Sequence, residues 1–122
     1  MRSWTSTPVG VVTLAERFPE REDRQAWYDD MKAYVRQLMK TPRGARSMRP
    51  TFTEGRAHLV GTSGTVTSIA GVHLRLPRYE RSKVDGLWMS CAEAEAACTR
   101  LRDLDLAGRS LEPTIGHDRA EL

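Results

Sequence analysis

The sequence predicts a single α/β domain, and three observations lead to this prediction. The chain has 122 residues, and because a domain typically takes roughly 100–200 residues, the chain is one domain at most. The short apolar run 57–60 has the character of a strand, and apolar residues at helical spacing follow it. Residues 20–39 and the segment after Ser90 carry the patterns of further helices.

Composition and charge place the chain among ordinary globular domains. Hydrophobic residues make up 39% and charged residues 29%, which argues against wholesale disorder. The net charge is +3, and the basic surplus lies in residues 1–56. No apolar run approaches the roughly 20 residues of a membrane span, and no secretory signal opens the chain. We therefore expect a cytoplasmic protein that does not insert into membranes.

The first part of the chain gives weak structural signals. Trp4–Thr7 is rich in strand formers and is followed by Pro8 and Gly10, so we expect an edge strand and a turn. Residues 11–15 fit either a strand or a short helix, and periodicity does not decide between them.

A helix is predicted over residues 20–39. Apolar residues recur there on one helical face, and acidic residues lie in the first turn, where they suit the helix dipole. The apolar residues are Trp27, Met31, Tyr34, Val35 and Leu38. Thr41-Pro42 is expected to end this helix, because proline disfavours a helical residue before it.

Residues 41–56 are predicted to form a loop, because the segment contains two prolines and two glycines. Four arginines lie in it: Arg43, Arg46, Arg49 and Arg56. Two interpretations remain open, a solvated surface connector and a rim that attracts a polyanion.

The best candidate site is the loop of small residues between the predicted strand 57–60 and the predicted helix 66–76. It consists of Gly61, Thr62, Ser63, Gly64 and Thr65. A strand that opens into small residues and enters a helix presents free backbone N–H groups, which attract phosphate. The alternative is a tight turn in which Ser63 or Thr65 caps the helix.

Other motifs for phosphate, nucleophile or metal chemistry fit less well. A nucleotide P-loop needs a lysine after its last glycine, and the nucleophile elbow needs a glycine at position 65, where Thr65 stands. The histidines His58, His73 and His117 do not have metal-ligand spacing. Cys91 and Cys98 would lie about 10 Å apart on a helix, beyond disulfide reach, and we interpret them as small buried apolar residues.

One well-defined helix is predicted in the last third of the chain. Residues 78–89 form a polar connector, and Ser90 and Glu93 have the spacing of a capping box. The helix that follows carries apolar residues on one face and fades by Gly108. Residues 118–122 have the character of the first turn of another helix.

The loop and its flanks resemble a known enzyme family. The segment 59–70 resembles the Gly-rich segment of the exopolyphosphatase/guanosine pentaphosphate phosphatase (Ppx/GppA) family. The segments 8–17, 76–79, 84–86 and 115–120 are similar to family segments in the same order, so the resemblance spans about residues 4–121.

The resemblance implies a fold and a reaction. The family belongs to the actin-like phosphotransferase superfamily, which has two lobes of ribonuclease H-like α/β fold around a cleft. Its reaction is Mg²⁺-assisted hydrolysis of a terminal phosphoanhydride, in inorganic polyphosphate or guanosine pentaphosphate. Residues Gly61–Thr65 would then be phosphate-binding and form one wall of the cleft in the second lobe.

The segments that carry catalysis in this family are missing from the chain. The aspartate-containing phosphate loop, the catalytic glutamate and an Asp-x-Gly-Gly-Gly-Ser loop do not occur in it. We therefore expect residues 1–122 to be a partial second lobe, with an incomplete sheet of few strands and three or more helices, that lacks the N-terminal lobe and the C-terminal helices. No catalytic residue and no metal ligand are assigned to it, and we expect the isolated chain to be inactive.

Three functional interpretations follow. In the leading one the chain supplies a phosphate-binding loop to a hydrolase, with the absent lobe as partner, a homodimer possible and no role for nucleic acid. In the second it is a non-enzymatic module that binds a polyanion such as RNA through residues 43–56. In the third it is a structural or dimerisation module and binds neither.

Overall fold

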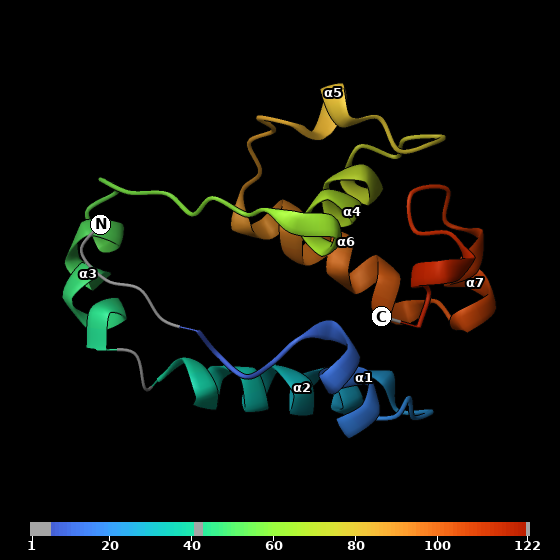
Figure 1. Ribbon diagram of the computed structural model, residues 1–122, viewed down its shortest axis with the longest axis horizontal. Helices are drawn as coiled ribbons and strands as arrows, with labels where there is room; N and C mark the ends of the chain where they lie inside the picture. The colour runs from blue at the N-terminus through green and yellow to red at the C-terminus, as the bar shows by residue number, and fades with distance from the viewer. Residues whose placement is uncertain (1–5, 41–42, 122) are drawn as a thin grey trace. The chain divides into compact units, whose positions relative to one another are not determined.

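The computed structural model describes residues 6–40 and 43–121, with the side chains of residues 43–47 excepted. All regular structure in this part of the chain is helical, and no strand is present in it, so the expected α/β ribonuclease H-like lobe is wrong (Figure 1). The elements are α1 (Val11–Arg17), α2 (Arg24–Met39), α3 (Arg43–Thr53), α4 (Ser63–His73), α5 (Arg81–Val84), α6 (Cys91–Asp103), α7 (Leu106–Leu111) and the 3₁₀ helix η1 (His117–Arg119). They fall into two compact units, Met1–Val60 and Gly61–Leu122.

The predicted strands are absent for a physical reason. Residues 57–60 have no regular structure, and Leu59 and Val60 are 85% and 77% exposed. A strand is stabilised by hydrogen bonds to a neighbouring strand, and the described residues provide none. Of the expected edge strand Trp4–Thr7, residues 4 and 5 lie outside the description, and Ser6 and Thr7 are not in a strand.

The first unit contains a helical pair, α1 and α2. The ambiguous segment 11–15 is helical, and the predicted helix 20–39 is confirmed over Arg24–Met39. Asp23 caps α2 by accepting a hydrogen bond from the Ala26 N–H at 2.9 Å. The indole N–H of Trp27 donates to the Phe18 carbonyl at 2.7 Å, and the Phe18 and Tyr34 rings lie 5.5 Å apart between centroids. These contacts join α2 to the end of α1.

The prediction of a loop over residues 41–56 is wrong for residues 43–53, which form α3. Pro50 lies inside this helix. Proline removes one hydrogen bond from a helix interior, yet its fixed φ is itself helical, so a single proline can remain in a helix of this length. Glu54 and Gly55 follow as a turn.

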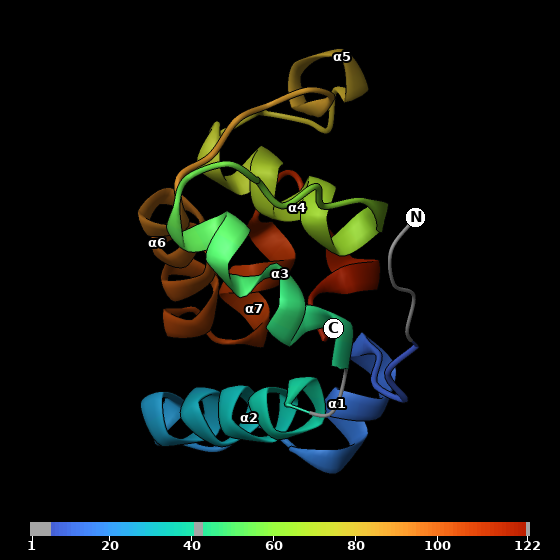
Figure 2. The ribbon, with the colours of Figure 1, turned by 90° about the vertical axis from the view of Figure 1, so that its left-hand side faces the viewer.

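The second unit holds every buried residue of the described chain. Its apolar cluster consists of Ala70, Leu76 and Val84, against which Leu74, Leu87 and Met89 pack. Helix α6 lies alongside α4, as Figures 1 and 2 both show, and Ala97 is buried on α6. The residues buried on these two helices are mostly small: Ser68, Ala70, Gly71, Val72 and Ala97.

Helix α4 ends in a Schellman motif. The Leu76 N–H donates to the Gly71 carbonyl and the Arg75 N–H to the Val72 carbonyl, both at 3.1 Å. Arg75 has φ of 51°, the left-handed conformation that this motif requires and that usually belongs to glycine. The buried Leu76 follows, and Pro77 then prevents the helix from continuing.

The capping box predicted at the start of α6 is confirmed. The Glu93 N–H donates to the Ser90 hydroxyl at 3.2 Å, and the Ser90 N–H donates to the Glu93 carboxylate at 2.7 Å. The helix ends at Asp103, and a separate helix, α7, occupies residues 106–111, where the sequence had indicated only a fading pattern. The interpretation of Cys91 as buried is wrong, because it is exposed; Cys98 is partly buried, and the two cysteines do not form a disulfide.

Candidate functional site

The five small residues of the candidate site lie at the start of α4. Gly61 and Thr62 precede the helix, whereas Ser63, Gly64 and Thr65 form its first turn. The helix therefore begins three residues earlier than the expected start at Val66. The earlier start matters because these residues then contribute the N–H groups of the helix N-terminus itself.

The residues around this first turn are mostly exposed. The first N–H groups of a helix have no partner within it, and the Thr62 side chain does not cap them. Of the five residues, Gly64 is partly buried and the other four are exposed. The first turn of α4 carries no acidic residue, so the positive end of the helix dipole is not offset there.

Ser63 has an unusual backbone conformation. Its φ is 82°, in the left-handed region that residues with a side chain rarely adopt. A strained residue at the entrance to a helix is retained only where its surroundings hold it in place. The strain lies inside the segment that the sequence selects for phosphate binding.

A cationic side chain lies beside this helix N-terminus. Arg119, in η1, places Nη1 3.1 Å from the Ser68 hydroxyl and 3.4 Å from the Gly64 carbonyl. A Cβ added at Gly64 would lie 3.2 Å from the same Nη1. Sequence reasoning missed Arg119 because more than fifty residues separate it from the loop; the only signal was its place in a segment similar to the Ppx/GppA family.

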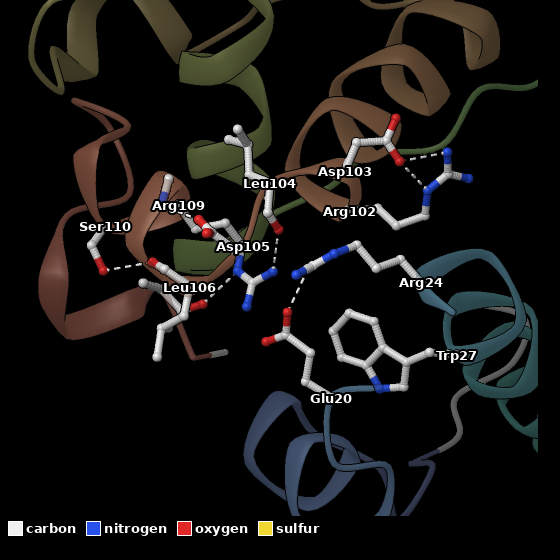
Figure 3. Close-up of polar contacts among 12 residues, drawn as sticks. Glu20, Arg24, Trp27, Arg102, Asp103, Leu104, Asp105, Leu106, Arg109 and Ser110 are labelled. Atoms are coloured by element: carbon white, nitrogen blue, oxygen red, sulfur yellow. Dashed lines mark hydrogen bonds and ion pairs between the residues drawn. The ribbon is translucent and has the colours of Figure 1, made fainter. Parts of the chain in front are cut away.

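Arg109 holds the segment from which Arg119 extends. Its Nη1 donates to the Leu104 carbonyl at 2.8 Å (Figure 3). Its Nε donates to the Ala120 carbonyl, also at 2.8 Å. Asp105 caps α7 through the Gly108 N–H at 2.7 Å. Because Ala120 adjoins Arg119 in sequence and is buried, the Arg109 contacts fix the backbone next to Arg119.

A second polar cluster lies at the other end of α4. His73 Nε2 is 3.9 Å from the Glu93 carboxylate. Hydrogen bonds from the backbone N–H and the hydroxyl of Ser90 hold the pKa of Glu93 below its ordinary value of 4.5, and His73 lowers it further. This cluster joins the end of α4 to the start of α6.

The remaining sequence candidates do not gather into a metal site. His58 and His117 are exposed, and the part of the chain that the structure describes contains no group of three His, Cys, Asp or Glu residues able to hold a metal. We therefore assign no ligand and no step to the Mg²⁺ implied by the family resemblance.

Most of the basic segment 43–56 is helical rather than a loop. Arg43, Arg46 and Arg49 lie on α3, and Arg49 is exposed. Arg56 forms an ion pair with Glu54, with Nε donating at 2.8 Å. The side chains of Arg43 and Arg46 fall outside the described residues.

Comparison of the chain with models of protein families, with curated proteins and with solved structures finds no match. None of the described helices combines the length and the apolar character that crossing a membrane requires.

Proposed function

We propose that Gly61–Thr65 binds the terminal phosphate of a phosphoanhydride, either inorganic polyphosphate or guanosine pentaphosphate, as part of a hydrolase. The observation that carries this proposal is the uncapped N-terminus of α4 with the Arg119 guanidinium beside it. The family resemblance of the same segment supports it. The proposal rests on the helix terminus and its neighbouring cation and requires no strand before the loop.

The chemistry of such a terminus suits a phosphate. Successive backbone N–H groups at a helix start donate to phosphate oxygens, and the helix dipole favours their negative charge. Arg119 has five N–H donors, of which Nη1 faces Ser68 and Gly64, so other donors remain for an anion. Asp118 is the acidic neighbour in this segment and lowers the local positive potential.

Catalysis itself is not assigned to this chain. Hydrolysis of a phosphoanhydride needs a base that orients water, and no carboxylate lies in the first turn of α4. We expect the loop to position the phosphate while the base comes from another part of the enzyme. The isolated chain should bind polyphosphate without hydrolysing it.

A binding titration on the full chain tests the proposal. We would measure affinity for polyphosphate, guanosine pentaphosphate and a DNA oligonucleotide of similar charge, with hydrolysis followed as phosphate release. Gly64→Val adds a branched side chain at the loop and against Arg119, so it should weaken polyphosphate binding about tenfold. Gly10→Val is the control, because Gly10 lies at the start of another helix, α1, and an added Cβ there would lie 4.0 Å from Thr13 Oγ1, an ordinary contact.

Two results would contradict the proposal. One is unchanged polyphosphate affinity in Gly64→Val when circular dichroism shows the same helix content. The other is an equal loss of affinity for DNA and for polyphosphate in Gly64→Val, since the substitution would then act on binding by charge alone.

A further inference from the structure

The connection between α4 and α6 is anchored to the core rather than loosely attached. Leu76 and Val84 are buried against Ala70 of α4, and Leu87 and Met89 pack against the same cluster. Helix α5 is therefore held in place at both ends. Side chains on the outer side of this connection have a supported backbone.

Two aromatic side chains of this connection are exposed. Trp88 stands between Leu87 and Met89 and is 72% exposed, as expected where consecutive residues of an extended segment point in opposite directions. Tyr79 is also exposed. Exposed large aromatic side chains in one anchored segment are typical of an interaction surface.

Cationic side chains accompany the aromatic ones. Residues 75–88 carry four cationic and two acidic side chains: Arg75, Arg78, Arg81, Lys83, Glu80 and Asp85. Glu80 lies 3.2 Å from Lys83 Nζ and 3.9 Å from Arg78 Nε. Arg75 and Arg81 are exposed and form no ion pair with another described residue. The segment therefore carries an excess of positive charge together with two exposed aromatic side chains.

We propose that this α5 surface, defined as Arg75, Arg78, Tyr79, Arg81 and Trp88, binds single-stranded nucleic acid. Bases stack on exposed aromatic rings regardless of sequence, and arginines pair with the phosphates between them. An acidic peptide would satisfy the arginines but leave the two rings without a partner of matching chemistry. This inference is independent of the phosphate site at the start of α4.

The test is a titration of the full chain with a fluorescein-labelled oligouridine of about 15 nucleotides, followed by anisotropy. Trp88→Ala should weaken binding about tenfold, and Trp88→Phe should restore most of it, because phenylalanine also stacks. The logarithm of affinity should fall with the logarithm of salt at a slope of about −2 if three arginines contact phosphates. The double variant Arg75→Gln/Arg81→Gln should reduce that slope by more than half.

Matched controls distinguish binding at this surface from binding that depends only on net charge or on exposed apolar side chains in general. Leu111→Ala removes another exposed apolar side chain of the same unit, and Arg36→Gln and Arg49→Gln remove exposed arginines elsewhere. These three variants should keep affinity within about twofold of the unsubstituted chain. Circular dichroism should be the same for all variants.

Three outcomes would overturn the proposal. The first is the absence of oligouridine binding in low salt. The second is an equal loss of oligouridine affinity in every arginine variant, which would indicate that binding follows net charge or takes place at the α3 segment. The third is a Trp88-dependent dimer in sedimentation with no effect of Trp88→Ala on oligouridine, which would assign the surface to a second copy of this chain.

Discussion

The guanidinium of Arg119 donates a hydrogen bond to the Ser68 hydroxyl at 3.1 Å, across 51 positions of sequence. This bond joins the C-terminal segment to the first half of α4. Removing either partner should lower the free energy of unfolding by about 0.5–1 kcal/mol, since Arg119 is exposed and a surface interaction is partly screened. A double-mutant cycle with Arg119→Ala and Ser68→Ala, read by urea unfolding, measures their coupling. Additive effects of the two substitutions would show that the bond does not stabilise the fold.

Replacing Arg75 with glycine should stabilise the chain. Arg75 has the left-handed backbone of the Schellman motif, which costs roughly 1–2 kcal/mol for a residue with a side chain, whereas glycine loses roughly 0.5–1 kcal/mol of backbone freedom. We expect a net gain of about 0.5–1 kcal/mol in urea unfolding. Arg75→Ala is the control and should show no gain, because alanine keeps the Cβ. An equal gain in both variants would assign the effect to lost charge.

Stability should depend on pH through Glu93. The hydrogen bonds from Ser90 lower its folded-state pKa below 4.5, so its contribution is complete above that value and is lost as pH falls through the folded pKa. The urea midpoint should therefore fall on acidification below about 4.5, and less steeply in Glu93→Gln. Identical acid profiles for the unsubstituted chain and Glu93→Gln would contradict the expectation.

A substitution of the buried Thr114 should stabilise the protein. The Thr114 hydroxyl is buried and has no hydrogen-bond partner among the described residues. Thr114→Val keeps the shape and removes the unsatisfied group, so thermal unfolding should indicate a gain of about 1 kcal/mol. An unchanged or lower stability of Thr114→Val would mean that the hydroxyl is satisfied in solution.

Gly71 lies against Thr114, and a larger side chain at Gly71 should lower the stability rather than raise it. An added Cβ at Gly71 would come within 2.8 Å of the Thr114 Cγ2 atom. Gly71→Ala should therefore cost about 1–3 kcal/mol in the same unfolding measurement, despite the higher helix propensity of alanine. Gly10→Ala, whose added methyl group would lie at an ordinary contact distance of 4.0 Å from Thr13 Oγ1, serves as the control. Equal effects of the two substitutions would rule out a close packing requirement at Gly71.

Local signals in the sequence predicted local structure well. The capping box at Ser90 depends on two residues three positions apart, and the structure has both of its hydrogen bonds. Helix α2 was predicted from apolar periodicity, because five apolar residues on one face need no distant information to identify a helix. The site segment itself was found from its small residues, although α4 begins earlier than expected.

Non-local structure could not be predicted in this way. A strand at residues 57–60 depends on a partner strand, and the described residues offer none, so the predicted α/β class is wrong. The segment 43–53 contains Gly44 and Pro50, which are typical of loops, yet it is helical. The approach of Arg119 to Gly64 depends on how α4 and the C-terminal segment pack, which no local pattern encodes.

The exposed pair Leu59 and Val60 has a practical consequence for handling the protein. Two adjacent, exposed, β-prone apolar residues whose backbone is not engaged in a sheet can pair with the same residues of other molecules. Concentrated solutions should accordingly form thioflavin-reactive aggregates, and a lysine at position 60 should delay them. Samples intended for titration or crystallisation would then keep best when dilute and freshly prepared.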